Sequence, residues 1–88
     1  MEITFDLGKD LANRAKHGMS LADARLLDWD SVISRQDSRH DYGEIRMIGI
    51  GYIRQRLHVV VYHERNDACR VISLRKANRR EEKYYAKT

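Results

Sequence analysis

The stretch Leu57-His58-Val59-Val60-Val61-Tyr62-His63-Glu64 decides the fold of this chain. It is the most apolar run in the sequence, and its β-branched and aromatic residues favour a strand. Side chains alternate between the two faces of a strand, so the odd-numbered residues of the run share one face and the even-numbered residues the other. Both faces carry apolar groups. We therefore expect one face to pack on helices and the other to meet a partner, the C-terminal tail or a substrate.

Two further strands are predicted on either side of this run. The segment from Glu44 to Ile53 precedes it and the segment from Cys69 to Arg75 follows it. The short connections between the three strands have hairpin length and turn residues, which predicts a β-meander. Gly49 and Gly51 interrupt the first strand, and glycines at such positions predict a bulge or a bend.

A helix is predicted close to the N-terminus. Asp6 can cap its first turn through the side-chain carboxylate, and Gly18 can end it in the left-handed conformation. Within it Leu7, Leu11 and Ala15 fall four residues apart. That spacing predicts one apolar stripe, with the polar residues of the helix lying off it.

Shorter signals predict the remaining elements. Residues 2–5 and 32–34 are expected to form short strands, and residues 37–43 a polar loop. Ser20 can cap a second helix. Asn78 opens a C-terminal helix with the pattern of a capping box.

Length and composition restrict the class of protein. The 88 residues leave room for one domain, residues 1–88. We expect an α+β fold with two N-terminal helices and a C-terminal helix on a small, mainly antiparallel β-sheet. No apolar run approaches the roughly 20 residues that span a bilayer, and no signal peptide is predicted. The lone Cys69 excludes an intrachain disulfide and fits a reducing cytoplasm.

Charge is unevenly distributed along the chain. Residues 1–44 carry six Lys or Arg against nine Asp or Glu, a net charge of −3. Residues 45–88 carry eleven against four, a net charge of +7. A half this basic can attract a polyanion such as RNA through phosphate contacts. Two alternatives remain open, which are a solvated basic surface and docking to an acidic partner protein.

The spacing of the residues that could carry chemistry predicts neither a metal site nor a nucleotide cofactor. The four histidines are scattered, and none has a Cys or carboxylate at ligand spacing, so no metal site and no cofactor are predicted. What remains is Arg, Lys, His and Tyr with one Glu on a small sheet. Such residues can clamp a phosphate and move protons, which suits cleavage of RNA through its 2′-hydroxyl. Each also has an ordinary structural explanation, such as a Glu44–Arg46 ion pair or a solvated helix start at Arg79 and Arg80.

The order of motifs resembles that of the BrnT-type ribonuclease toxins. Their N-terminal signature, N-x-x-K-H-G-[VI]-S-F-x-x-A, is similar to Asn13-Arg14-Ala15-Lys16-His17-Gly18-Met19-Ser20 with Ala24. A later motif of the same toxins agrees in residue type and order with Arg70-Val71-Ile72-Ser73-Leu74-Arg75-Lys76-Ala77, followed by Arg80-Glu81 and Tyr84. The resemblance spans nearly the whole chain. It implies a type II toxin with a RelE/ParE-like fold.

The resemblance also implies an activity and partners. We expect a metal-independent, cytoplasmic endoribonuclease that inhibits translation and contacts no membrane. Its expected partner is a cognate DNA-binding antitoxin, which neutralises it by direct contact in a hetero-oligomer, so that DNA is contacted only through the antitoxin. The alternatives are a non-catalytic basic module that holds RNA or an acidic partner, and a pure protein-interaction subunit.

Site residues are expected in four groups. The phosphate-binding group of the catalytic site is Arg46, Arg65, Arg75 and Arg80. The proton-transfer group is Glu44 and His63, with Lys16 and His17 as a second set. Tyr84 is expected to orient the nucleotide or stack on a base. Further RNA contacts are expected from Arg79, Arg80 and Lys83.

Overall fold

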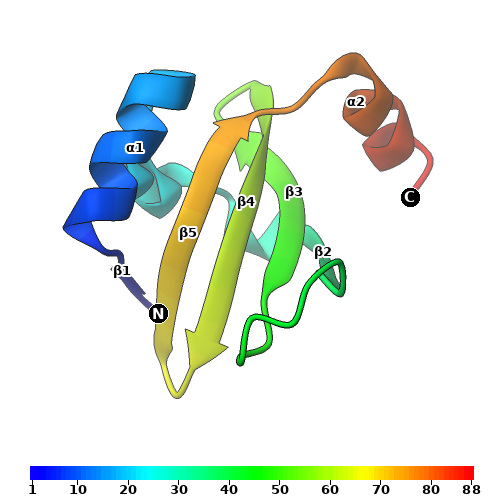
Figure 1. Ribbon diagram of the computed structural model, residues 1–88. Helices are drawn as coiled ribbons and strands as arrows, with labels where there is room; N and C mark the ends of the chain where they lie inside the picture. The colour runs from blue at the N-terminus through cyan, green and yellow to red at the C-terminus, as the bar shows by residue number, and fades with distance from the viewer.

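The computed structural model describes residues 1–88 and contains a five-stranded mixed sheet with helices on both sides (Figure 1). The strands are β1 Glu2–Thr4, β2 Ile33–Gln36, β3 Met47–Ile53, β4 Arg56–Arg65 and β5 Ala68–Lys76. The helices are α1 Leu7–His17, the 3-10 helices η1 Leu21–Leu26 and η2 Trp29–Ser31, and α2 Arg79–Ala86. The sheet order is β1-β5-β4-β3-β2, and only the β1–β5 pair is parallel. The α+β class and the mainly antiparallel sheet are therefore confirmed.

The predicted meander is present as β3, β4 and β5, which are joined by two-residue turns. Each turn holds one residue in the left-handed region, Arg54 at φ 57° and Asn66 at φ 58°. The first long strand begins at Met47 instead of Glu44. The three residues before it lie outside the sheet, and the Glu44 side chain bonds to Arg70 of β5, as described below.

The predicted bulge at Gly49 and Gly51 is wrong. Both glycines pair with β4 in regular register. A Cβ atom would lie 2.8 Å from Val32 Cγ1 at Gly49 and 2.5 Å from Val32 Cγ2 at Gly51, so these glycines make room for Val32. The irregularity lies in β5, where the register with β4 shifts after Val61 and leaves Ile72 without a pairing partner.

The caps of the N-terminal helices are confirmed. The Asp6 carboxylate accepts a hydrogen bond from the Lys9 N–H at 2.9 Å, and Gly18 ends α1 with φ 71°. The Ser20 hydroxyl accepts from the Ala22 N–H at 3.1 Å. The element that Ser20 caps is η1, a 3-10 helix of six residues.

The predicted apolar face of α1 is wrong. Leu7 is 75% exposed and Leu11 is 69% exposed, and Ala15 is exposed as well. The buried residues of this helix are Asp10 and Asn13. Both polar side chains bond to backbone groups of neighbouring elements. The helix therefore packs through polar contacts that spacing alone cannot reveal.

Apolar side chains form one cluster on each face of the sheet. The larger cluster lies under α1 and η1, and its central members are Leu21, Val60, Val71 and Leu74. The smaller cluster lies on the opposite face, where α2 covers one end of the sheet (Figure 1). We call this second face the open face, because the rest of it carries no helix. No helix of the chain is long and apolar enough to cross a membrane.

Candidate functional site

A cluster of charged side chains lies on the open face at the far end of β4 from α2. The Glu44 carboxylate Oε2 accepts a hydrogen bond from Arg46 Nε at 3.1 Å and another from Arg70 Nη2. His63 pairs with Arg70 across β4 and β5, which puts both side chains on the same face. We call Glu44, Arg46, His63 and Arg70 the Glu44 cluster. Three of its members were predicted as site residues.

Arg70 is the member that the sequence analysis missed. Its place opposite His63 follows from the meander register, but the bulge at Ile72 shifts that register, so alternation alone gives the wrong face. The Nε atom of Arg70 is buried and has no hydrogen-bond partner. A guanidinium with free N–H groups beside a carboxylate is suited to hold an anion such as phosphate.

The electrostatics of Glu44 favour a positioning role. The hydrogen bond from Arg70 is the largest influence that lowers the pKa of Glu44, and the bond from Arg46 lowers it further. The carboxylate therefore stays ionised at neutral pH and is a weak proton acceptor. Its geometry instead holds the guanidinium groups of Arg46 and Arg70 side by side.

His63 has the geometry of a proton acceptor. Its Nδ1 lies 2.7 Å from the backbone carbonyl oxygen of Ile45. A carbonyl can only accept, so Nδ1 carries the hydrogen and donates it. In the neutral ring this leaves the lone pair on Nε2, which is free to take a proton.

The loop before β3 holds Arg46 in place. The Arg46 guanidinium carbon lies 4.1 Å from the centroid of the Tyr42 ring, a cation–π contact. The Tyr42 hydroxyl donates to the buried Asp37 carboxylate at 3.0 Å. Arg39 donates two bonds of 2.9 Å to the same carboxylate, and these hold the pKa of Asp37 well below its usual range.

Arg75 forms a second group beside the start of α2. Its guanidinium donates to both oxygens of Glu81, at 2.9 and 2.8 Å. Glu81 also accepts from the Asn78 N–H at 2.8 Å, and Asn78 accepts from the Glu81 N–H, which confirms the predicted capping box. These bonds lower the pKa of Glu81 and raise that of Arg75. Arg75 thus lies at the N-terminus of α2, and the Glu81 carboxylate occupies the guanidinium that was expected to bind phosphate.

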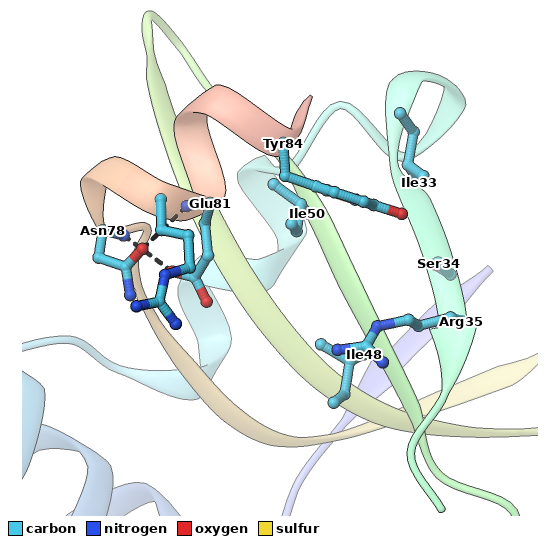
Figure 2. A pocket seen from close by; sticks show the side chains of 9 residues that line it. Ile33, Ser34, Arg35, Ile48, Ile50, Asn78, Glu81 and Tyr84 are labelled. Atoms are coloured by element: carbon cyan, nitrogen blue, oxygen red, sulfur yellow. Dashed lines mark hydrogen bonds between the residues drawn. The ribbon is translucent and has the colours of Figure 1, made fainter. Parts of the chain in front are cut away.

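A cavity of about 480 Å³ lies between α2 and the sheet (Figure 2). Its lining comes from β2, β3 and α2, and consists of Ile33, Ser34, Arg35, Ile48, Ile50, Asn78, Arg80, Glu81 and Tyr84. Tyr84 is 52% exposed, and its ring extends from α2 across the cavity toward β2. The neighbouring Tyr85 anchors the helix, since its hydroxyl donates to the Ser31 carbonyl at 2.8 Å.

The second proton-transfer set lies apart from the Glu44 cluster. Lys16 and His17 line a smaller cavity of about 230 Å³ beside Ile72 and Ser73. Burial lowers the pKa of His17, and the nearby charges of Lys16 and Arg75 lower it further. His17 therefore lies near Arg75.

The predicted site residues thus fall into two groups and a scattered remainder. Val59 pairs with Arg75 and His63 with Arg70, so the two groups lie about 13 Å apart along β4 at the rise of a strand. Arg65, Arg79 and Lys83 are exposed and make no ion pair. No three His, Cys, Asp or Glu side chains lie close enough together to hold a metal ion.

Fold and site together define a small α+β protein with a cluster of basic side chains around one carboxylate on an open sheet face. Residues 5–81 match the family described as ribonuclease toxin, BrnT, of type II toxin–antitoxin system. This chain belongs to that family, as the motif resemblance predicted.

A solved structure agrees with the family assignment. The crystal structure of the Brucella abortus ribonuclease toxin BrnT is similar to this chain with a TM-score of 0.70 and 28% sequence identity. The similarity covers 90% of this chain and 99% of the Brucella chain. No curated protein sequence matches this one. The RelE/ParE likeness stays a prediction.

Proposed function

We propose that this chain is the toxin of a type II toxin–antitoxin pair and an endoribonuclease that works without a metal ion. The observation that carries the proposal is the Glu44 cluster on the open face of a BrnT family member. There a carboxylate, two guanidinium groups and a histidine with a free Nε2 lie together. These are the groups that phosphodiester cleavage through a 2′-hydroxyl requires.

The guanidinium groups of Arg46 and Arg70 bind the phosphate in this proposal. Glu44 uses Nε of Arg46 and Nη2 of Arg70, which leaves the Nη groups of Arg46 and Nη1 of Arg70 for the phosphate oxygens. Negative charge grows on those oxygens in the transition state, where fixed donors stabilise it most. Arg65 on β4 and Arg79, Arg80 and Lys83 on α2 attract the rest of the RNA chain.

His63 transfers the proton in this proposal. Nε2 takes the proton of the 2′-hydroxyl, the 2′-oxygen attacks the adjacent phosphorus, and the bond from phosphorus to the 5′-oxygen breaks. The departing oxygen takes a proton from water on the exposed side of the site. The products are a 2′,3′-cyclic phosphate and a 5′-hydroxyl end. Arg75, Lys16 and His17 lie too far away for this step and act on neighbouring phosphates.

The cellular role follows from the family. Cleavage of RNA in the cytoplasm would inhibit translation. A cognate DNA-binding antitoxin would neutralise the toxin by direct contact in a hetero-oligomer, so that the toxin reaches DNA only through its partner. We expect a neighbouring gene to encode a small DNA-binding protein. That protein should co-purify with this chain.

The test is a cleavage assay with matched substrates. Purified protein is incubated in EDTA with a single-stranded RNA and with a DNA of the same sequence, which lacks the 2′-hydroxyl. We expect cleavage of the RNA alone, with cyclic phosphate ends, and loss of cleavage in Arg46→Ala. Equal cleavage of the DNA, or complete loss of activity in EDTA, would contradict the mechanism. Binding without cleavage would favour the non-catalytic module.

A further inference from the structure

We infer that the cavity between α2 and the sheet is a nucleobase pocket that selects guanine in the RNA substrate. The inference rests on the proposed function, because it names the part of the substrate that this cavity takes. The cavity volume of about 480 Å³ lies within the roughly 300–1,000 Å³ of small-molecule sites.

The shape of the cavity suits a flat, apolar ring. Ile33, Ile48 and Ile50 form its floor on β2 and β3. The Tyr84 ring stands opposite this floor, with half of its surface exposed (Figure 2). Single-stranded RNA is recognised largely by stacking of its bases on aromatic side chains. A base that enters here would cover apolar surface of the isoleucines and the tyrosine together.

The polar groups of the cavity are mainly donors. Arg35 and Arg80 make no ion pair with any residue of the chain. The one carboxylate, that of Glu81, has both oxygens occupied by Arg75 and the Asn78 N–H. The Asn78 oxygen accepts from the Glu81 N–H, so its amide nitrogen is the group left to donate. A ligand with acceptors fits this cavity better than one with donors.

Guanine matches this donor-rich lining. Its O6 and N7 atoms are adjacent acceptors, and a guanidinium can bond to both. Adenine has an amino donor next to N7, and cytosine has an amino donor on the corresponding edge, so neither presents the two adjacent acceptors that a guanidinium bonds. A site that bonds to a base edge discriminates strongly against bases that leave its polar groups unpaired.

The cavity also lies close enough to the Glu44 cluster for one RNA strand to occupy both. Ile48 in the cavity floor pairs with Val61 on β4. His63 follows two residues further along the same face, at about 7 Å by the rise of a strand. The selected guanine is therefore a base that neighbours the cleaved phosphodiester bond.

The test uses RNA that binds without being cut. Fluorescent 2′-O-methyl octanucleotides of uridine carry one guanine, and their dissociation constants are measured by anisotropy. The guanine is then replaced by hypoxanthine, which keeps O6 and N7, by 7-deazaguanine, which lacks N7, by adenine, or by an abasic sugar. We expect guanine and hypoxanthine to bind alike, 7-deazaguanine and adenine to bind more weakly, and the abasic strand to bind about tenfold or more weakly.

Protein variants connect the preference to the cavity. Tyr84→Ala should bind guanine and abasic strands alike, while Tyr84→Phe should keep the preference. Arg35→Gln should remove the difference between guanine and 7-deazaguanine. Leu11→Ala, an exposed apolar change on α1, should match the wild type. Circular dichroism checks that every variant is folded.

Three outcomes would overturn the inference. The first is base-blind binding by the wild type, and the second is equal loss of affinity for guanine and abasic strands in Tyr84→Ala. The third is loss of antitoxin binding alone in Tyr84→Ala, which would assign the cavity to that partner. Cleavage of unmodified RNA, measured in parallel, tests the proposed function separately, since base-blind cleavage contradicts only the inference.

Discussion

The side-chain amide of Asn13 takes the place of a neighbouring strand for Leu74. Its Nδ2 donates to the Leu74 carbonyl at 2.9 Å, and the Leu74 N–H donates to its Oδ1 at 3.1 Å. β1 pairs with β5 only as far as Arg70, so the edge of β5 beyond that point has no strand partner. The same Nδ2 also donates to the Met19 carbonyl at 2.9 Å. One amide thus satisfies buried backbone groups of β5 and joins α1 to the turn that follows it.

Replacing Asn13 should destabilise the fold more than replacing the leucines of α1. Asn13→Ala leaves two buried backbone groups of Leu74 unpaired, and each such group costs about 1–3 kcal/mol. We expect the free energy of unfolding to fall by about 2–4 kcal/mol in urea titrations with an unchanged m-value. Leu11→Ala is the control and should change it by about 0.5 kcal/mol or less, because its side chain is exposed. A larger effect at Leu11 would contradict the packing of α1.

The buried Asp37 should make the stability of the fold decrease at acidic pH. Its bonds with Arg39 lower its pKa in the folded state below the value of about 3.9 in an unfolded chain. The stabilisation is therefore complete above the unfolded value and is lost as the pH falls through the folded one. Thermal unfolding is measured between pH 7 and pH 2.5. The Tm of the wild type should approach the Tm of Asp37→Asn at the acidic end of this range. Parallel curves for the two proteins would show that the Asp37–Arg39 pair does not stabilise the loop.

Variants of the Glu44 cluster should separate proton transfer from positioning. His63→Ala should lower the rate of RNA cleavage about 100-fold or more and change the shape of the pH–rate profile. Glu44→Gln should lower the rate through misplaced guanidinium groups and leave that shape unchanged. Single-turnover rates across pH give both readouts. A profile that changes only with Glu44→Gln would assign the proton transfer to Glu44 instead.

The Arg75–Glu81 pair should reveal whether Arg75 binds substrate or only anchors α2. If Arg75 binds a phosphate next to the cleaved one, Arg75→Ala weakens RNA binding and lowers kcat/KM about tenfold or more, as expected for loss of a charge-assisted hydrogen bond. Glu81→Gln then has a smaller effect, since it breaks the same ion pair and keeps the guanidinium. Cleavage rates and unfolding midpoints are compared for both variants. Equal effects of the two changes on rate and stability would mean that Arg75 acts through α2 alone.

Local signals explain how much of the fold was predictable. The caps at Asp6, Ser20 and Asn78 and the hairpin turns depend on bonds between residues a few positions apart. The apolar run of β4 likewise determined a central strand with apolar groups on both faces, because side chains alternate between the faces of a strand. The family motifs were predictable in the same way, since they are properties of residue order.

Tertiary contacts decided the features of the fold and the site that residue order does not determine. Sixty-one positions separate Asn13 from Leu74, and that contact turned the predicted apolar stripe of α1 outward. Twenty-six positions separate Glu44 from Arg70, and their contact added a guanidinium to the site. The bulge at Ile72 brought that guanidinium to the open face. Such pairings depend on which backbone groups are left unsatisfied once the sheet has formed, and a buried polar group must find its partner wherever the fold places one.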